Sequence, residues 1–379
     1  MPGAPGGLSG TSTSSSVSLS WSAVSGATSY NVYRNGTKVG SPTGTSYTDS
    51  GLAASTSYSY QVSASNAAGE GAKSSTVSVT TQSGGGGNTG SKKAAPYLYM
   101  GWGDPPSPTT VMNATGIKWF TMAFILSSGG CNPAWDGSRP LQGSADANAI
   151  AAIHAAGGDV VPSIGGWSGN KLGPNCSTPE ALAGAYQQVI SAYGLKAIDI
   201  DIENSDEFEN EAVQDRILGA LKIVKQNNPG IQTILTFGTS TTGPNYYGNR
   251  LIERSAALGA NIDIFTLMPF DFGSGNIYND TVGASTGLNN KLKATFGWTT
   301  AVAYSHQGIS GMNGLSDQQE MTTTATWQNI TNWARTNGLG RLAFWSVNRD
   351  RGCAGGGVVS NCSGIAQPDW EFTRITAGF

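Results

Sequence analysis

The strongest constraint on the fold is a stretch in which acidic and aliphatic side chains alternate. Residues 198–203 read Ile-Asp-Ile-Asp-Ile-Glu. Successive side chains of a β-strand point to opposite faces, so Asp199, Asp201 and Glu203 share one face and the isoleucines share the other. The isoleucines require an apolar layer behind the strand. Because unpaired charge is costly to bury, three acids on the front face of a buried strand indicate a functional site.

The composition is typical of an exported protein that meets water with neutral polar groups. Charged residues make up 12% of the 379 residues, about half the usual share. The net charge of −3 provides no general attraction to nucleic acid or to an anionic membrane. No stretch approaches the roughly 20 apolar residues of a membrane helix. Composition, rather than a targeting segment, is the basis for expecting secretion.

The chain has 4 cysteines, an even number that permits two disulfides. Cys353 and Cys362 flank a glycine-rich loop, and we expect them to pair. Cys131 and Cys176 would then pair with each other; the alternative is four reduced thiols. No CxxC motif occurs and only 2 histidines are present, so we expect no metal site.

Residues 1–82 contain short alternating runs and no helical periodicity, which predicts an all-β module. Turn chemistry such as Asn35-Gly36 separates the runs. The pattern resembles a fibronectin type III sandwich, on the basis of Trp21, Tyr33, Leu52, Tyr58, Val62 and the segment 66–69. Residues 83–94 are rich in glycine and serine and predict a flexible linker, which either tethers a roaming domain or merely separates two folded units.

Residues 95–379 alternate apolar runs with helix-like stretches, which predicts parallel strands. The eight runs are residues 97–102, 118–125, 159–164, 197–203, 233–237, 262–270, 300–304 and 341–345. Eight such repeats fit a (β/α)₈ barrel, whose active sites lie at the carboxyl ends of the strands. Glu203 ends the fourth run, where a catalytic residue is expected.

The spacing of the acids favours one kind of chemistry. Alternate residues of a strand lie about 6–7 Å apart, so the three carboxylates repel one another and at least one keeps a proton. This suits Glu203 as a general acid supported by Asp201. Both acids lie on one side of a substrate, which favours a nucleophile supplied by the substrate itself. The alternative is a structural salt-bridged cluster, although no basic residue shares this strand face.

Four motifs together resemble those of glycoside hydrolase family 18 chitinases. Residues 199–203 match most of the DxxDxDxE signature, and residues 163–166, Ser-Ile-Gly-Gly, resemble SxGG. Residues 268–271, Met-Pro-Phe-Asp, resemble MxYD, and Trp345 falls where the family keeps a tryptophan as the floor of the cleavage subsite. The motifs occur in the family's order between Tyr97 and the C-terminus.

The resemblance implies a secreted, monomeric endo-chitinase that acts on chitin or chitooligosaccharides without metal or organic cofactor. Glu203 would protonate the glycosidic oxygen, and the substrate's 2-acetamido carbonyl would attack its own anomeric carbon to form an oxazolinium ion. Asp201 would orient the acetamido N–H, and Asp199 would share a proton with Asp201. Glu203 would then act as the base toward water, so that configuration is retained. Met268, Phe270, Asp271, Trp345 and Trp102 are candidates for substrate binding; Asp271 as a helix cap and Trp345 as core packing are the alternatives.

The chain departs from the family pattern at two positions. Lys196 replaces the first aspartate of the signature, which is a supporting position. Phe270 replaces the tyrosine of MxYD and cannot donate a hydrogen bond to the acetamido carbonyl. We expect Tyr304, at the end of the seventh run, to supply that donor.

Three other functions remain compatible with the sequence. An endo-β-N-acetylglucosaminidase that cuts the core of N-glycans would use the same acetamido chemistry. A catalytically weak chitin-binding lectin could use the same barrel, although such proteins commonly lose the acid that Glu203 retains. In the third, the fibronectin-like module does the binding, but it shows no obvious row of exposed aromatic residues.

Overall fold

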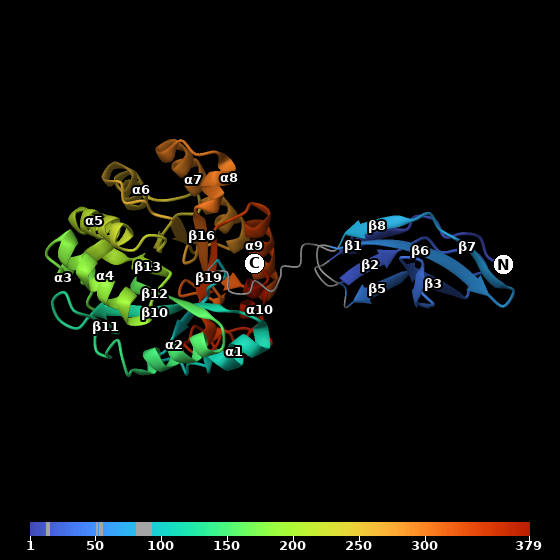
Figure 1. Ribbon diagram of the computed structural model, residues 1–379, viewed down its shortest axis with the longest axis horizontal. Coiled ribbons are helices and arrows are strands. Elements are labelled where there is room, and N and C mark those ends of the chain that lie inside the picture. The colour runs from blue at the N-terminus through green and yellow to red at the C-terminus, as the bar shows by residue number, and fades with distance from the viewer. Residues whose placement is uncertain (13–15, 51, 53–55, 81–92) are drawn as a thin grey trace. The chain divides into compact units, whose positions relative to one another are not determined.

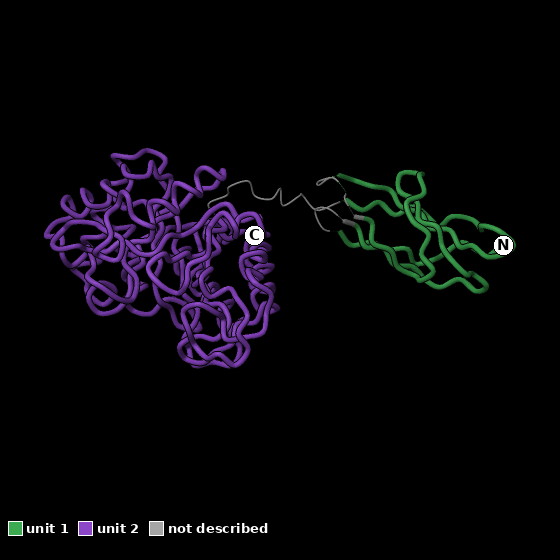
Figure 2. Tube along the Cα trace, turned by 90° about the horizontal axis from the view of Figure 1, so that it is seen from below, with its two compact units in different colours: residues 1–89 green, residues 90–379 purple. Residues whose placement is uncertain are grey.

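The computed structural model describes residues 1–12, 16–50, 52, 56–80 and 93–379. The chain divides into two compact units, residues 1–89 and residues 90–379 (Figure 2). Residues 83–92 of the predicted linker lie outside the described ranges, so the linker stays a prediction. Each unit is considered by itself below.

The first unit is a sandwich of two antiparallel sheets, as predicted. One sheet contains β1 (Ser9–Ser12), β2 (Ser16–Ser20) and β5 (Ser46–Ser50). The other contains β4 (Thr37–Gly40), β3 (Ser29–Arg34), β6 (Ser57–Asn66), β7 (Gly69–Lys73) and β8 (Val77–Thr80). The β3–β4 turn is formed by Asn35 and Gly36, both with positive φ, as a tight hairpin requires. Trp21 and Tyr30 pack edge to face in the core between the sheets.

The second unit is built around parallel strands that close into a barrel with helices outside (Figure 1). In barrel order the strands are β9 (Tyr97–Tyr99), β10 (Trp119–Ser127), β12 (Asp159–Gly165), β13 (Ala197–Ile202), β14 (Gln232–Gly238), β15 (Ile264–Met268), β16 (Gln307–Met312) and β19 (Arg341–Trp345). A parallel bridge between Ala94 and Leu342 joins the last strand to the first. The predicted (β/α)₈ barrel is confirmed. Three short strands lie outside the barrel: β11 (Pro133–Trp135), β17 (Gly314–Leu315) and β18 (Met321–Thr322).

Helices on the outside cover the barrel. They are α1 (Pro108–Thr115), α2 (Ala145–Ala155), α3 (Leu172–Asn175), α4 (Pro179–Tyr193), α5 (Glu211–Asn227), α6 (Tyr246–Leu258), α7 (Ile277–Phe296), α8 (Thr300–Ser305), α9 (Thr324–Thr336) and α10 (Glu371–Ala377). Helix α4 shows why they form where they do. The Thr178 side chain accepts from the N–H of Ala181, Pro179 occupies the first turn, and Gly194 ends the helix in the left-handed conformation. Each helix in the described part of the chain is too short or too polar to cross a lipid bilayer.

The predicted seventh strand, residues 300–304, is wrong. These residues form helix α8, because the Thr299 side chain caps it by accepting from the N–H of Val302. The seventh strand is β16, whose Gly308 and Gly311 resemble turn residues in the sequence. A Cβ at Gly308 would lie 2.5 Å from Thr266 Oγ1, and one at Gly311 would lie 2.6 Å from the Trp327 ring. The two glycines therefore allow close packing on both sides of a buried strand.

Both predicted disulfides are present in the second unit. One joins Cys131, just after β10, to Cys176, at the end of α3. The other joins Cys353 to Cys362 in the segment after β19. The pairing predicted from the cysteine positions is thus confirmed.

Candidate active site

The acidic row of β13 runs from the barrel interior to an open cleft. Asp199 is 0% exposed and Asp201 2% exposed, whereas Glu203 is half-buried and lines the cleft. The isoleucines between them belong to the main apolar core, as predicted from their alternation. The three acids therefore lie at three depths along one strand, and Glu203 is the most accessible to a ligand.

Asp199 is held by hydroxyl groups from three other strands. Its Oδ2 accepts from the hydroxyls of Tyr97 and Ser163, each at 2.8 Å, and its Oδ1 accepts from Thr236 at 2.6 Å. These donors come from β9, β12 and β14, so the barrel must close before the site exists. Three donors satisfy a carboxylate that water cannot reach.

Asp201 lacks such partners. Tyr97 Oη lies 3.4 Å from its Oδ2, and its Oδ1 has no hydrogen-bond partner within the described part of the chain. Burial raises the pKa of Asp201 well above its usual value, and the nearby charges of Glu203 and Asp199 raise this pKa further. Asp201 therefore tends to hold a proton near neutral pH and has one oxygen available for a ligand.

The pKa of Glu203 suits proton donation near neutrality. Burial raises this pKa from 4.5 to about 7, the Lys171 ammonium opposes the increase, and the carboxylate of Asp271 adds to it. A carboxyl with this pKa exists in both protonation states near pH 7, as a group that first gives and then takes a proton requires.

The segment that resembles SxGG forms a tight turn against β13. Gly165 and Gly166 have φ values of 116° and 88°, which favour glycine. A Cβ at Gly165 would lie 2.1 Å from the carbonyl oxygen of Asp201, and the N–H of Gly166 donates to the same oxygen at 2.9 Å. These glycines shape the turn that fixes the backbone of Asp201.

A cleft of about 890 Å³ brings together most of the predicted site residues. Its lining includes Asp201, Glu203, Met268, Phe270, Asp271, Trp345 and Trp102. Asp199 does not line the cleft. The hydroxyl of Tyr97, which does, contacts both Asp199 and Asp201. A smaller hollow of about 410 Å³ shares Glu203, Trp167 and Met268 with the cleft and extends over Asn204 and Phe208.

Trp345 presents its ring to the cleft from within an aromatic group. It stacks on Phe124 with a centroid distance of 5.5 Å and an interplanar angle of 13°. It also contacts Tyr97 at 5.8 Å and Tyr99 at 5.9 Å. The ring is thus fixed in place by its neighbours while it still lines the cleft, as a platform for a sugar requires.

The structure corrects the expectation for Tyr304. This residue lies on α8, where its ring packs against Trp333 of α9 at 5.8 Å, and it does not line the cleft. It cannot replace the hydroxyl that is missing at Phe270. Asp271 is no helix cap: its φ is 60°, and its Oδ1 accepts from the N–H of Gln318 in a neighbouring loop at 3.0 Å.

Two buried ionisable residues that interact with Glu203 were not among the predicted site residues. Lys171, just before α3, is 1% exposed, and its Nζ donates to the carbonyl of Trp167 at 3.1 Å. Glu207 lies in a π-helical turn, η1 (Asn204–Phe208), that follows Glu203 directly. Its Oε2 has no partner among the described residues, and burial raises its pKa to about 8, with Lys171 opposing. No pattern in the sequence links Lys171 or Glu207 to the acidic row.

Comparisons with known proteins give matches to both units. Residues 3–89 match the model of the fibronectin type III domain. Active domain 2 of the chitinase from Pyrococcus furiosus superposes with a TM-score of 0.69 and 28% identity, over 74% of this chain and 92% of that chain. The second unit is related to chitinases.

Two proteins with chitinase names are also similar to this chain in sequence over about three quarters of its length. A probable bifunctional chitinase/lysozyme of Escherichia coli is 25% identical over 307 residues, which are 75% of this chain and 34% of the relative. Chitinase Chi52 of Paenibacillus xylanexedens is 28% identical over 317 residues, 77% of this chain and 59% of the relative. The chain thus spans less than two thirds of the length of either relative.

Proposed function

We propose that the second unit is a secreted chitinase that hydrolyses β-1,4 bonds between N-acetylglucosamine units. The main support for this proposal is the difference in burial among the three acids. Glu203 lines the cleft, whereas Asp199 and Asp201 are buried behind it. A structure of the related Pyrococcus furiosus domain is complexed with chito-oligosaccharides, which supports the same ligand class here. The two disulfides support export to an oxidising compartment.

In the proposed first step, Glu203 donates its proton to the glycosidic oxygen as the bond to the anomeric carbon breaks. The carbonyl oxygen of the sugar's 2-acetamido group attacks that carbon from the other side and forms an oxazolinium ion. Asp201 Oδ1, which has no partner among the described residues, accepts the acetamido N–H and so orients the acetamido group. Asp199, already satisfied by three hydroxyls, keeps Tyr97 and the strand in register.

In the second step, water attacks the anomeric carbon and gives a proton to the Glu203 carboxylate. The oxazolinium ring opens, and the product keeps the original configuration. No hydroxyl is present at Phe270 to contact the acetamido oxygen, but the cleft lining also contains Ser310 and Gln318, which are polar. Trp345 provides the floor on which the reacting sugar rests.

The decisive test is Glu203→Gln, which keeps size and hydrogen bonding but removes the transferable proton. We expect hydrolysis of colloidal chitin and of an N-acetylglucosamine hexasaccharide to fall by a factor of about 10³ or more, with hexasaccharide binding retained. Glu180→Gln, in the exposed first turn of α4, is the matched control and should retain full activity. Near-normal turnover by Glu203→Gln would contradict the assignment.

Product analysis separates the proposed function from its alternatives. Proton NMR early in the digestion of the hexasaccharide should show the β-anomer first, since the mechanism retains configuration. Parallel digestion of a high-mannose glycopeptide tests for endo-β-N-acetylglucosaminidase activity. Faster cleavage of the glycopeptide would favour that alternative, and binding without cleavage of either substrate would favour a lectin.

A further inference from the structure

The segment after β19 contains a closed loop that contacts the backbone next to Trp102, a residue of the cleft lining. We define the disulfide loop as residues 353–362, which the Cys353–Cys362 bond closes. Its base is paired, since the N–H of Cys353 donates to Ile365 at 2.9 Å and that of Ser363 donates to Arg351 at 3.0 Å. The buried Arg349 donates from Nε to the carbonyl of Val359 within the loop at 3.0 Å. The loop is thus held to the barrel at its base and in its middle.

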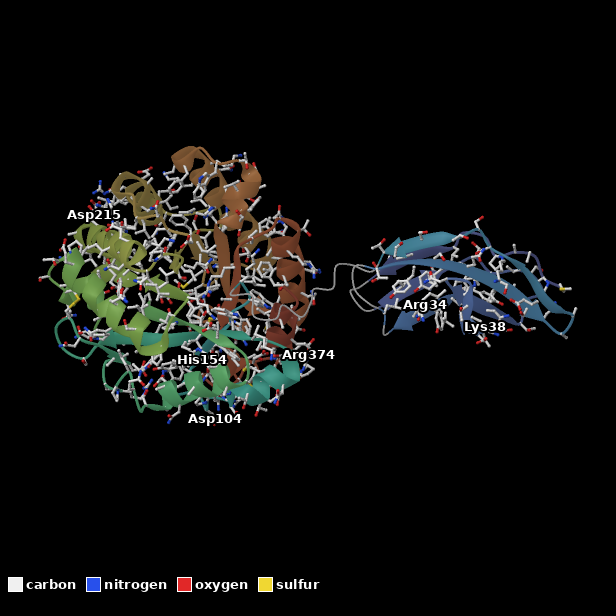
Figure 3. The ribbon with its side chains drawn as sticks, in the orientation of Figure 1. Arg34, Lys38, Asp104, His154, Asp215 and Arg374 are labelled. Atoms are coloured by element: carbon white, nitrogen blue, oxygen red, sulfur yellow. A yellow bond between two sulfur atoms is a disulfide. The ribbon has the colours of Figure 1, made fainter. Side chains whose placement is uncertain are left out.

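The disulfide loop meets the segment that carries Trp102. A Cβ at Gly103 would lie 2.6 Å from the carbonyl oxygen of Ser360, so the two backbones are in direct contact. Arg351, at the base of the loop, donates to Asp104 Oδ2 at 3.0 Å and to the Asp104 carbonyl at 2.6 Å. Asp104 lies at the periphery of the second unit (Figure 3), with a side chain that is 80% exposed. Both residues that follow Trp102 are therefore held by the loop or its base.

Trp102 itself has few contacts that fix its ring. The side chain is 51% exposed, and the ring meets Tyr99 edge-on at 5.2 Å. Asn348 holds the backbone, since its Nδ2 donates to the carbonyls of Tyr99 at 2.8 Å and Trp102 at 3.0 Å. The direction of the indole therefore depends on Tyr99 and on the backbone on either side of Trp102, and the disulfide loop holds one of those sides.

We propose that the disulfide loop positions Trp102 as an outer sugar platform of the cleft and thereby sets its affinity for long chains. This inference rests on the proposed function. Tyr99 contacts both Trp345 and Trp102, so the inference places the two tryptophan rings at different sugar units of one bound chain. A platform that is fixed before binding costs less to order than a mobile one, so opening the loop weakens the binding of long substrates. Cys353, Cys362, Gly103 and Arg351 are positioning residues and do not touch the substrate.

The chain contains its own control, because it has a second disulfide elsewhere in the unit. We compare Cys353→Ser/Cys362→Ser with Cys131→Ser/Cys176→Ser on two substrates. These are an N-acetylglucosamine hexasaccharide and a disaccharide that carries 4-nitrophenol. Opening the disulfide loop should raise KM for the hexasaccharide by about fivefold, with kcat within about twofold and the disaccharide unaffected. The control pair should leave the ratio of the two KM values unchanged.

Two further variants keep the test valid if the cysteine variant folds poorly. Arg351→Gln and Gly103→Ala leave the disulfide intact but disturb the contacts with Asp104 and Ser360, and each should raise KM for the hexasaccharide in the same way. Trp102→Ala should raise it at least as much, and adding Arg351→Gln to Trp102→Ala should produce no further increase. Melting temperatures show whether each variant is folded.

The outcomes separate this inference from the proposed function. Arg351→Gln can be introduced into the parent protein and into Trp102→Ala. If it raises KM for the hexasaccharide equally in both, the loop does not act through Trp102. An unchanged hexasaccharide KM in the folded loop variants would overturn the inference and leave the chitinase proposal intact. A parent protein that cleaves neither substrate would overturn both.

Discussion

At the scale of single residues, the three acids of the site are chemically similar but differ in their hydrogen-bond partners and in their burial. Asp199 receives three hydroxyl donors, Asp201 has an oxygen without a partner among the described residues, and Glu203 reaches the cleft. Burial raises the pKa values of Asp201 and Glu203, and the Lys171 ammonium limits the increase at Glu203. Lys171 is thus a buried cation that keeps the acid within the neutral range.

Replacing Lys171 with methionine should move the pH profile. Burial and the Asp271 carboxylate still act on Glu203 in this variant, so loss of the ammonium raises the pKa of Glu203 above about 7. The alkaline limb of kcat/KM reports deprotonation of the general acid, and we expect it to move to higher pH. The measurement is kcat/KM for the hexasaccharide between pH 4 and pH 10.

Lys222→Met is the matched control for this prediction. Lys222 also donates to a backbone carbonyl, that of Leu258, but it is exposed on α5. Its pH profile should match that of the parent protein. A limb that stays in place or moves to lower pH in Lys171→Met would show that Lys171 does not act on Glu203.

At the scale of elements, β16 shows how packing can override local pattern. Its two glycines reduce strand propensity, yet the strand is buried throughout. Gly311 lies against the Trp327 ring of α9, and that ring is held by a hydrogen bond from Nε1 to Thr376 at 2.9 Å. The contact between β16 and α9 therefore depends on the absence of a side chain.

Gly311→Ala should destabilise the second unit. The added methyl would lie 2.6 Å from a ring that cannot easily move, and such overpacking costs about 1–3 kcal/mol. Gly184→Ala, on the exposed face of α4 with open space around the new Cβ, should instead stabilise the unit by roughly 0.5–1 kcal/mol. Urea denaturation measures both changes. Equal effects of the two substitutions would refute the packing explanation for the glycines of β16.

At the scale of the whole molecule, the two units differ in what they offer a ligand. Among the described residues of the first unit, the aromatic side chains are buried or partly buried, so this unit presents no exposed aromatic row. The second unit holds the cleft and the acids. The cleft and the acids thus lie together in the barrel.

The second unit should lose stability as pH rises from about 5 to about 8. Burial raises the folded-state pKa values of Glu207 to about 8, Glu203 to about 7 and Asp350 to about 6, and raises that of Asp201 as well. The folded state therefore binds more protons than the unfolded state in this range, and the free energy of unfolding falls with rising pH. The expected loss is on the order of a few kcal/mol, measured by urea denaturation at pH 5, 6.5 and 8.

Glu207→Gln should flatten this dependence, because the amide cannot lose a proton. Glu180→Gln, which alters an exposed side chain, should leave the slope as it is. If the free energy of unfolding of the parent protein rose between pH 5 and pH 8, the raised pKa values could not be right.

The sequence alone determined the acidic row, the order of the motifs and the change of pattern between the two parts of the chain. These features depend on periodicity and spacing along the chain, which local rules can interpret. Only the tertiary structure decided that β16 rather than residues 300–304 is the seventh strand, that Tyr304 lies away from the cleft, that the cysteines pair as they do, and that the Lys171 ammonium acts on Glu203. Each of these depends on contacts between segments separated in the chain, and the alternation of side chains within one segment carries no information about them.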